Sequence, residues 1–347
     1  MATLSTPAAV EQSRAEVVGT HRRGFREKWL SPALLSPSLI AIFIFVYAFI
    51  GFTFWTSISN WKTNKRDLSI SDPWYKTYDT LINHNRFQID LRNTFVFTVL
   101  FLTLTIVSGM ALALMLDRHV MGSGLFRSIF LFPYAISFIT TGVVWRWIFN
   151  PETGVNALFE QVGLNAALER AGVGPLKPGW ITDPSVVWQV NGALESVFPW
   201  ADNISAKLGI PLALIPIVIT AAWQLSGFAM AMYLAGLGTI PSEVKEAALL
   251  DGASDWRAYK DIIIPLLKPI TISTMLILGH VSLKIFDLVY AMSGKGPGFA
   301  TDVPGIYVYD FLFQSQQYNR GAAASIVMLV LVAIVIVPYL WRQMKEL

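Results

Sequence analysis

Long apolar runs without a charged residue recur along the chain, and each is long enough to cross a membrane. A helix needs about 20 residues to span the hydrocarbon core of a bilayer. The longest uncharged runs are Trp29–Trp61, Asn93–Leu116, Leu208–Ser242 and Gly321–Trp341. Ser128–Trp145 is just long enough, and the run after Pro269 is interrupted only by the charges of Lys284 and Asp287. We therefore predict six spans, at about 37–58, 93–116, 126–149, 211–235, 269–291 and 321–341.

The composition supports an all-α integral membrane protein surrounded by membrane lipid. Of 347 residues, 54% are hydrophobic and 14% charged, whereas soluble domains carry about 25% charged residues. The protein contains no cysteine, which excludes disulfides and thiolate metal sites. The net charge of +3 gives no indication of a nucleic-acid partner, and we expect none.

The positions of Lys and Arg indicate how the chain is oriented. Residues 1–32 are polar and basic and have no cleavage site, so the first span is interpreted as an uncleaved signal anchor. Basic residues are denser in the termini and in the segments 117–127 and 236–269, which puts both termini in the cytoplasm. The basic stretch 22–36 is either a helix on the inner membrane surface or flanking charge alone.

Three longer segments, 59–92, 150–210 and 292–320, are then expected outside the cell. Within 150–210 we predict short helices at Val155–Ala171 and Val186–Phe198, separated by Gly and Pro turns. This segment is too small for an independent core, so we expect it to cap the outer mouth of a transport path.

A charged segment, 239–269, lies between the fourth and fifth spans on the cytoplasmic side. Thr239–Ser242 supplies capping chemistry for a first helix, and Glu243 favours its positive end. Gly252 suits the end of that helix, and Ser254 can cap a second one. The sequence therefore predicts two short helices joined by a glycine turn.

The first of these two helices is predicted to present a shallow face of small residues. Its members are Val244, Ala247, Ala248, Asp251 and Gly252, bordered by Glu246. Small side chains allow close approach of another backbone, as for a helix seated in a groove of a partner. The alternative is an amphipathic helix lying on lipid, which the scarcity of large apolar residues at the centre disfavours.

This segment resembles the EAA motif of permeases from ATP-binding cassette (ABC) importers. The matching residues are Glu246, Ala247 and Ala248, then Gly252, then Ile262–Pro265, with Ile264 where the family usually has Leu. Further matches to the carbohydrate branch are Leu234–Pro241, Asp251–Ala253, Phe286–Tyr290, Gly296, Pro297, Thr301, Asn150–Pro151, Gly154, Asn156 and Trp180–Pro184. The chain is thus similar to maltose-type permeases over about 35–341, with extra length at about 185–210.

The resemblance implies a transmembrane domain, 33–347, that forms the translocation path for a sugar or glycoside in a bacterial inner membrane. It implies a second permease subunit in a heterodimer, two ATP-binding subunits and an external solute-binding protein. By the same resemblance, Glu246, Ala247, Ala248 and Gly252 are the ATPase-coupling residues. ATP and magnesium would bind to the partner ATPase, and no cofactor or metal is expected on this chain.

The chain itself carries no catalytic motif. It has no G-x-x-x-x-G-K-[ST] phosphate loop, no H-E-x-x-H pair and no nucleophile elbow. We therefore expect no enzymatic activity from it, and any ATP hydrolysis must take place on a partner.

Polar residues at membrane depth are candidates for the substrate path, because burying them in lipid is expensive. His280, Lys284 and Asp287 are spaced i, i+4 and i+7, so one continuous helix would place them on one face. Either Lys284 and Asp287 pair to hold helices in register, or the three form a polar wall for sugar hydroxyls. Gln224 and Phe228 share a face of the fourth span, where an amide and a ring could hold a sugar.

A second class of function remains compatible with the spans. An ion-coupled secondary transporter of a small polar solute would use the 280–287 residues as its ion site. The EAA-like segment and the lack of a visible inverted repeat with broken helices disfavour this alternative.

Overall fold

The computed structural model describes residues 25–117, 121–197 and 204–345. The predicted segment 1–32 lies outside the described residues as far as residue 24, and so does Phe198 at the end of a predicted helix. The chain divides into two compact units, Met1–Phe52 and Thr53–Leu347. The first contains α2 (Phe25–Ile42), a π-helical turn η1 (Phe43–Ala48) and the start of α3 (Phe49–Ser57).

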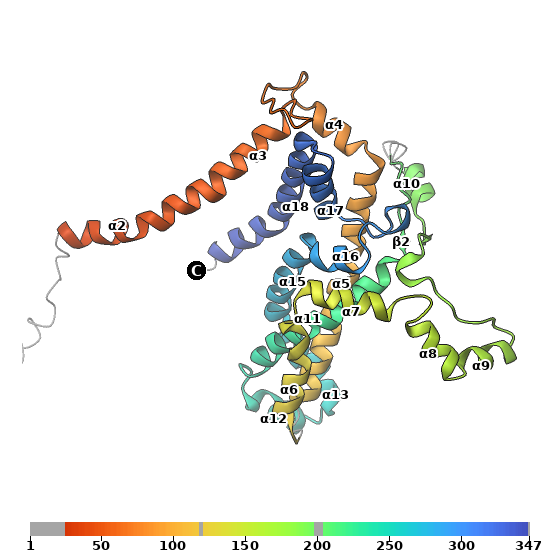
Figure 1. The fold of residues 1–347 in the computed structure, drawn as a ribbon. Helices are drawn as coiled ribbons and strands as arrows, with labels where there is room; N and C mark the ends of the chain where they lie inside the picture. Colours follow the sequence, from red (N-terminus) through yellow and green to blue (C-terminus); the bar gives the residue numbers. More distant parts are fainter. Residues whose placement is uncertain (1–24, 118–120, 198–203, 346–347) are drawn as a thin grey trace, which may run out of the picture. The chain divides into compact units, whose positions relative to one another are not determined.

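The second unit is almost entirely helical (Figure 1). Its long helices are α5 (Asn85–Asp117), α11 (Leu214–Leu237), α15 (Lys268–Leu283) and α18 (Tyr318–Lys345). The shorter α-helices are α4 (Lys76–Ile82), α6 (Ser123–Leu131), α7 (Phe138–Ile148), α8 (Val155–Gln161), α9 (Leu164–Arg170), α10 (Asn191–Val197), α12 (Ser242–Leu250), α13 (Asp255–Ala258), α14 (Ile264–Leu266), α16 (Asp287–Met292) and α17 (Pro304–Tyr309). Helical turns of other types are η2 (Phe132–Ala135), η3 (Trp180–Thr182), η5 (Tyr259–Ile263), η6 (Pro297–Phe299) and η7 (Asp310–Gln314).

Four helical stretches are long and apolar enough to cross a membrane without a break. They are Leu34–Ser57, Asn85–Asp117, Leu214–Leu237 and Tyr318–Tyr339. Each overlaps one of the predicted spans, because an uncharged run of this length can satisfy its backbone polar groups only as a helix. Exposed apolar side chains cover much of Leu34–Phe49, as expected for a span that faces lipid or another protein.

The third and fifth predicted spans are not continuous helices. Ser123–Ala135 and Phe138–Ile148 meet at a bend of 97°, and Asp255–Leu266 meets Lys268–Leu283 at 59°. The described part of the chain therefore has four candidate spans, or up to six if each bent pair crosses once. Helix α15, in the fifth predicted span, also ends at Leu283. The rest of that predicted span, to residue 291, lies mostly in the separate helix α16.

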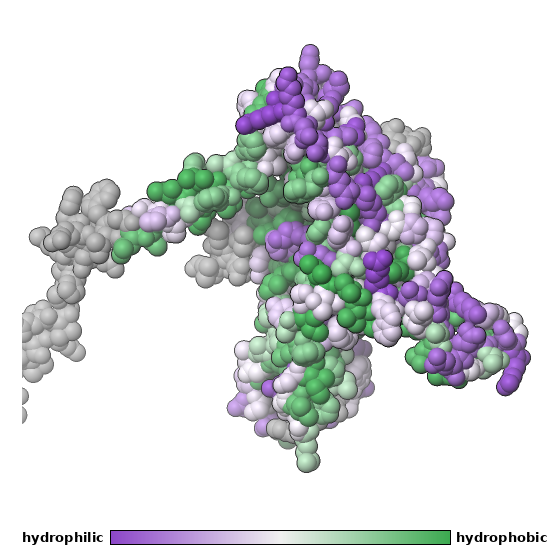
Figure 2. All heavy atoms as spheres, in the orientation of Figure 1, coloured by the Kyte–Doolittle hydropathy of each residue, from purple (hydrophilic) through white to green (hydrophobic). Residues whose placement is uncertain are grey.

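The segment 150–210 also differs from its prediction. The single helix expected at Val155–Ala171 is divided into α8 and α9 by Gly163, whose φ of +74° ends the first helix. The start of the helix expected at Val186–Phe198 is instead strand β1 (Val186–Val187), which pairs antiparallel with β2 (Ile210–Pro211). In Figure 2, hydrophilic side chains gather over α4 and over α8 and α9.

The core of the second unit forms where α5 packs along α11. Buried apolar side chains from both helices join others from α15 and α16, with Phe97, Phe101, Leu214, Ile217 and Leu278 among them. Gly109 allows a close approach of the two helices: a Cβ there would overlap the Ala229 methyl group and lie 2.9 Å from the Met230 amide nitrogen. This packing fixes the two helices that carry the candidate site.

Gly109→Ala should lower the melting temperature of the purified protein, because the added methyl group has no room against α11. Overpacking of this kind costs about 1–3 kcal/mol. Gly124→Ala is the matched control, since a Cβ at this position in α6 meets open space. There alanine should be neutral or slightly stabilising, by up to ~1 kcal/mol. Equal melting temperatures for the two variants would contradict the close packing.

Candidate functional site

Two short helices joined by a glycine turn follow α11 directly. Helix α12 ends in a Schellman-type turn, in which the Ala253 amide donates to the Ala248 carbonyl at 3.0 Å. Gly252 occupies the left-handed position of this turn, with a φ of +82° that favours glycine. Ser254 then begins α13, and its side-chain oxygen accepts from the Arg257 amide at 3.4 Å.

The accessible face of α12 differs from the one that residue size indicated. Ala248 is 5% exposed and packs inward, and Val244 is half-buried. Glu246, Ala247 and Gly252 are exposed, and Leu250 is 88% exposed. The open surface therefore combines a carboxylate, a methyl group, a bare glycine turn and one large apolar side chain. We call these four residues the α12 surface.

Residues beneath this surface connect it to the long helices. A buried cluster joins the ends of α5 and α11 to the segment that follows α13, with Leu116, Tyr233, Tyr259 and Leu267 among its members. The Tyr259 hydroxyl donates to an Asp117 carboxylate oxygen at 3.0 Å, and the Tyr233 hydroxyl donates to Thr271 Oγ1 at 3.1 Å. These contacts tie the segment after α13 to α5, and α11 to α15, while α13 itself packs against α12.

The expected polar face of His280, Lys284 and Asp287 does not exist as one helical stripe. Helix α15 ends at Leu283, Phe286 has non-helical angles, and Asp287 begins α16. No ion pair between Lys284 and Asp287 is present in the described structure, and both side chains are exposed. Residues spaced i, i+4 and i+7 share a face only in an unbroken helix. The break at residues 284–286 therefore makes this prediction wrong.

Gln224 and Phe228 take different positions on α11. Gln224 is 2% exposed, and its Nε2 donates to the Ile136 carbonyl at 2.7 Å. This contact satisfies a backbone group at the bend between η2 and α7. The Phe228 ring is half-buried and stacks on Tyr134, with 5.4 Å between ring centroids, while Tyr134 is 51% exposed. The accessible ring of this pair is thus Tyr134.

A buried group of charges joins the start of α5 to the segment 295–310, and sequence reasoning missed it. Arg86 Nε donates to Asp302 at 2.6 Å, and its Nη2 donates to Asp310 at 2.7 Å. Lys295 Nζ lies 2.6 Å from the same Asp310 oxygen. Asp90, one turn after Arg86, is fully buried beside them and interacts with Asp302 and Arg86. We call these five residues the charge cluster.

Burial and pairing act in opposite directions on Asp302. Burial raises the pKa of its carboxyl above the ordinary value, and the hydrogen bond from Arg86 lowers it. Burial also raises the pKa of the neighbouring Tyr307 to about 12, so this hydroxyl stays protonated. Because the partners are separated by 216 and 224 residues, no local spacing could have indicated the cluster.

The described residues contain no group of three or more His, Asp or Glu side chains that could hold a metal ion. The arrangement instead combines an exposed, rigidly connected helix surface with broken helices that carry polar and aromatic groups.

Comparison with known proteins gives consistent matches over most of the chain. A family model described as binding-protein-dependent transport system inner membrane component matches residues 106–343. A probable ABC transporter permease protein of Pyrococcus horikoshii is 34% identical over 90% of this chain and 94% of its own length. The xylose/arabinose import permease protein of Haloferax volcanii is 30% identical, covering 87% of this chain and 84% of that protein.

A solved structure shares the fold. It is a crystal structure of a bacterial ABC transporter involved in the import of the acidic polysaccharide alginate. One of its chains aligns with a TM-score of 0.67 at 20% identity, covering 92% of this chain and 96% of the other.

Arg86→Gln should strongly destabilise the second unit, because it leaves Asp302 and Asp310 buried without their main cationic partner. Breaking a buried ion pair from one side costs about 3–5 kcal/mol. The control is Lys177→Gln, which removes an exposed pair with Glu160 at 3.8 Å. That loss should stay within about 1 kcal/mol. Thermal unfolding of both purified variants tests this, and similar melting temperatures would show that the cluster contributes nothing to stability.

Proposed function

The chain belongs to the family of binding-protein-dependent transport system inner membrane components, and on this premise we propose that it is the permease subunit of an ATP-driven sugar or glycoside importer. The observation that carries the proposal is the match to sugar permeases along almost the whole chain. The absence of a phosphate-binding loop from the sequence agrees with it, because the energy must then come from another subunit.

The proposed assembly has a second, distinct permease, two ATP-binding subunits and a solute-binding protein on the outer side. ATP and magnesium bind to the ATP-binding subunits. In this arrangement both termini and the α12 surface face the cytoplasm, and the segments 59–92, 150–210 and 292–320 face outward. The external segments then form the surface that receives the solute-binding protein.

The α12 surface is the proposed contact with the ATPase. Glu246 pairs with a basic residue of the ATPase, while Ala247 and the glycine turn at Gly252 allow close approach of its backbone. Ala248 packs inward and supports the helix from behind. ATP-driven movement of the ATPase surface that binds α12 would pull this helix. The contacts of Tyr259 and Tyr233 would pass that movement to the spans.

The proposed substrate path follows the broken helices. Tyr134, stacked on Phe228, offers an accessible ring to the apolar face of a sugar. Lys284 and Asp287 are exposed on either side of the break after α15, and His280 is half-buried one turn earlier. These three supply donors and acceptors for hydroxyl groups, whereas Gln224 positions the bend near Ile136.

Uptake of a labelled glycoside by cells that carry the complete importer tests the source of energy. Transport should stop when ATP is depleted and continue when the proton gradient is collapsed while ATP is maintained. The opposite pattern would identify an ion-coupled transporter and contradict the proposal.

Gly252→Asp should abolish uptake while the amount of protein in the membrane stays normal. The side chain is strained at a φ of +82° and also projects into the proposed ATPase contact. Gly122→Asp is the matched control, with a φ of +79° and, as at Gly252, no atom within 4 Å of a built Cβ. If strain alone mattered, both variants would fail. Undiminished uptake by Gly252→Asp would refute the role of the α12 surface.

A further inference from the structure

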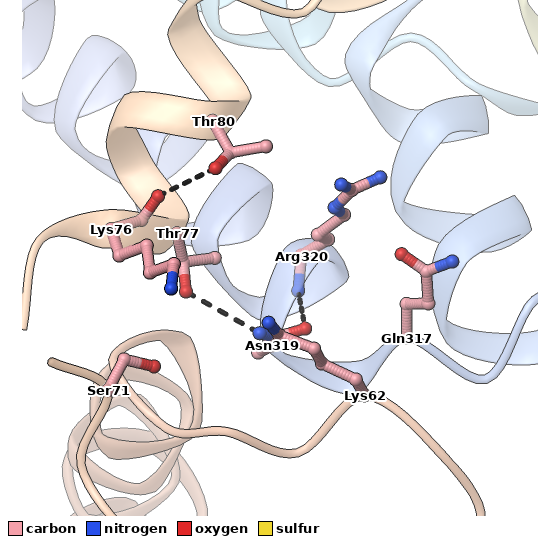
Figure 3. Close-up of a pocket in the computed structure, with 8 residues that line it drawn as sticks. All are labelled: Lys62, Ser71, Lys76, Thr77, Thr80, Gln317, Asn319 and Arg320. Atoms are coloured by element: carbon pink, nitrogen blue, oxygen red, sulfur yellow. Dashed lines mark hydrogen bonds between the residues drawn. The ribbon is translucent and has the colours of Figure 1, made fainter.

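A small polar pocket lies between the segment that follows α3, the helix α4 and the start of α18 (Figure 3). Its volume is about 200 Å³. The lining residues are Lys62, Ser71, Lys76, Thr77, Thr80, Gln317, Asn319 and Arg320. This pocket shares no residue with the α12 surface, the proposed path or the charge cluster.

The pocket carries three positive charges and no carboxylate. Lys62, Lys76 and Arg320 line it, and none of them forms an ion pair among the residues that the structure describes. Lys62 and Lys76 are exposed and Arg320 is half-buried, so an anion that enters the pocket meets three positive charges that attract it. The lining is therefore suited to an oxyanion.

The floor of the pocket is buried and bears hydrogen-bonding groups. Thr77 and Asn319 are 5% and 1% exposed. The side-chain nitrogen Nδ2 of Asn319 is 3.5 Å from Thr77 Oγ1 and 3.2 Å from the Ser59 carbonyl oxygen. Thr77 accepts in the first of these contacts, so its hydroxyl hydrogen is available to a bound oxygen. Figure 3 shows the contact between Thr77, which α4 carries, and Asn319 near the start of α18.

The pocket lies at the ends of two predicted spans. Helix α3 ends at Ser57 and α18 begins at Tyr318. Trp61 joins the two ends. Its carbonyl accepts from the backbone amide of Asn319 at 3.0 Å, and the centroids of the Trp61 and Tyr318 rings are 4.5 Å apart. Trp55, Trp74 and Tyr75 nearby in sequence are about half exposed. Exposed Trp and Tyr at span ends are typical of the headgroup level of a membrane.

We propose that this pocket binds the phosphate group of an anionic phospholipid in the outer leaflet. The lysines and Arg320 neutralise the phosphate, Thr77 donates to one of its oxygens, and the neighbouring aromatic side chains lie among the headgroups. The leaflet rests on the proposed orientation, but binding of the lipid does not depend on transport. The proposal also explains why basic residues collect on a face that the positive-inside tendency leaves poor in them.

The size of the pocket separates this ligand from the transported solute. Sites for drug-sized ligands enclose about 300–1,000 Å³, so a cavity of about 200 Å³ holds a headgroup phosphate and little more. An acidic side chain of the solute-binding protein would present a similar charge. The position at the span ends, beside exposed aromatic residues, favours lipid.

Native mass spectrometry of the purified complete importer, titrated with phosphatidylglycerol, tests the proposal. The wild type should retain the lipid, and Lys62→Gln/Lys76→Gln should retain it on the order of tenfold less, because each lysine contributes to attraction of an anionic headgroup. Lys177→Gln, which makes the same charge change as Lys76→Gln alone but on an exposed lysine outside the pocket, should bind as the wild type does. If the double variant is unstable, Lys76→Gln alone should still show a severalfold loss.

Further arms distinguish the sources of the anion. Phosphatidylcholine should be retained less than phosphatidylglycerol, and millimolar inorganic phosphate should not displace the anionic lipid. Full displacement by inorganic phosphate would show a site for free phosphate. Unchanged lipid retention by the double variant, with weaker capture of the solute-binding protein, would show a protein contact; either result overturns the proposal. Because lipid retention and glycoside uptake are measured separately, loss of one leaves the other interpretable.

Discussion

The structure depends on one constraint: a backbone polar group inside a membrane must find a partner within the protein. A regular helix meets this requirement by itself, and any break must be satisfied by other groups. At the bend between η2 and α7, the Ile136 carbonyl accepts from Gln224, and Ser137 Oγ accepts from the Thr140 amide at 3.2 Å. After α15, the Lys284 and Ile285 amides turn back to the Val281 and Ser282 carbonyls. The breaks are thus built into the fold, because other groups of the protein satisfy the backbone at each of them.

This constraint also explains which parts of the fold the sequence could predict. Helices α5, α11 and α18 follow from uncharged runs, since such a run has only one way to satisfy its backbone. The ends of α12 and α13 follow from Gly252 and Ser254, whose chemistry is local. The breaks do not, because their partners, such as Gln224 for Ile136, lie 88 residues away. Helical spacing therefore grouped His280, Lys284 and Asp287 on a face that the chain does not form.

The same limit applies to the candidate site. Ala247 and Ala248 are adjacent and identical in size, yet Ala247 is exposed and Ala248 is buried. Only the packing of α12 against the rest of the protein distinguishes them. The charge cluster required knowledge of contacts between α5 and the segment 295–310. Motifs predicted which segments carry the candidate site, whereas tertiary packing decides which side of each segment is exposed.

Helix α5 runs from the charge cluster at its first turn to the contact with Tyr259 at its last turn. It has 33 residues, hence a length of about 50 Å, and a polar contact holds it near each end. Arg86 ties its first turn to Asp302 and Asp310, and Asp117 in its last turn accepts from Tyr259 beneath α12. The glycine contact with α11 lies between these two ends. In the proposed function, α5 would carry a displacement of α12 and α13 toward the charge cluster as rigid movement, because a packed helix resists bending more than a loop does. Opening of the outer side would then require the charge cluster and its segment to move together with the helix.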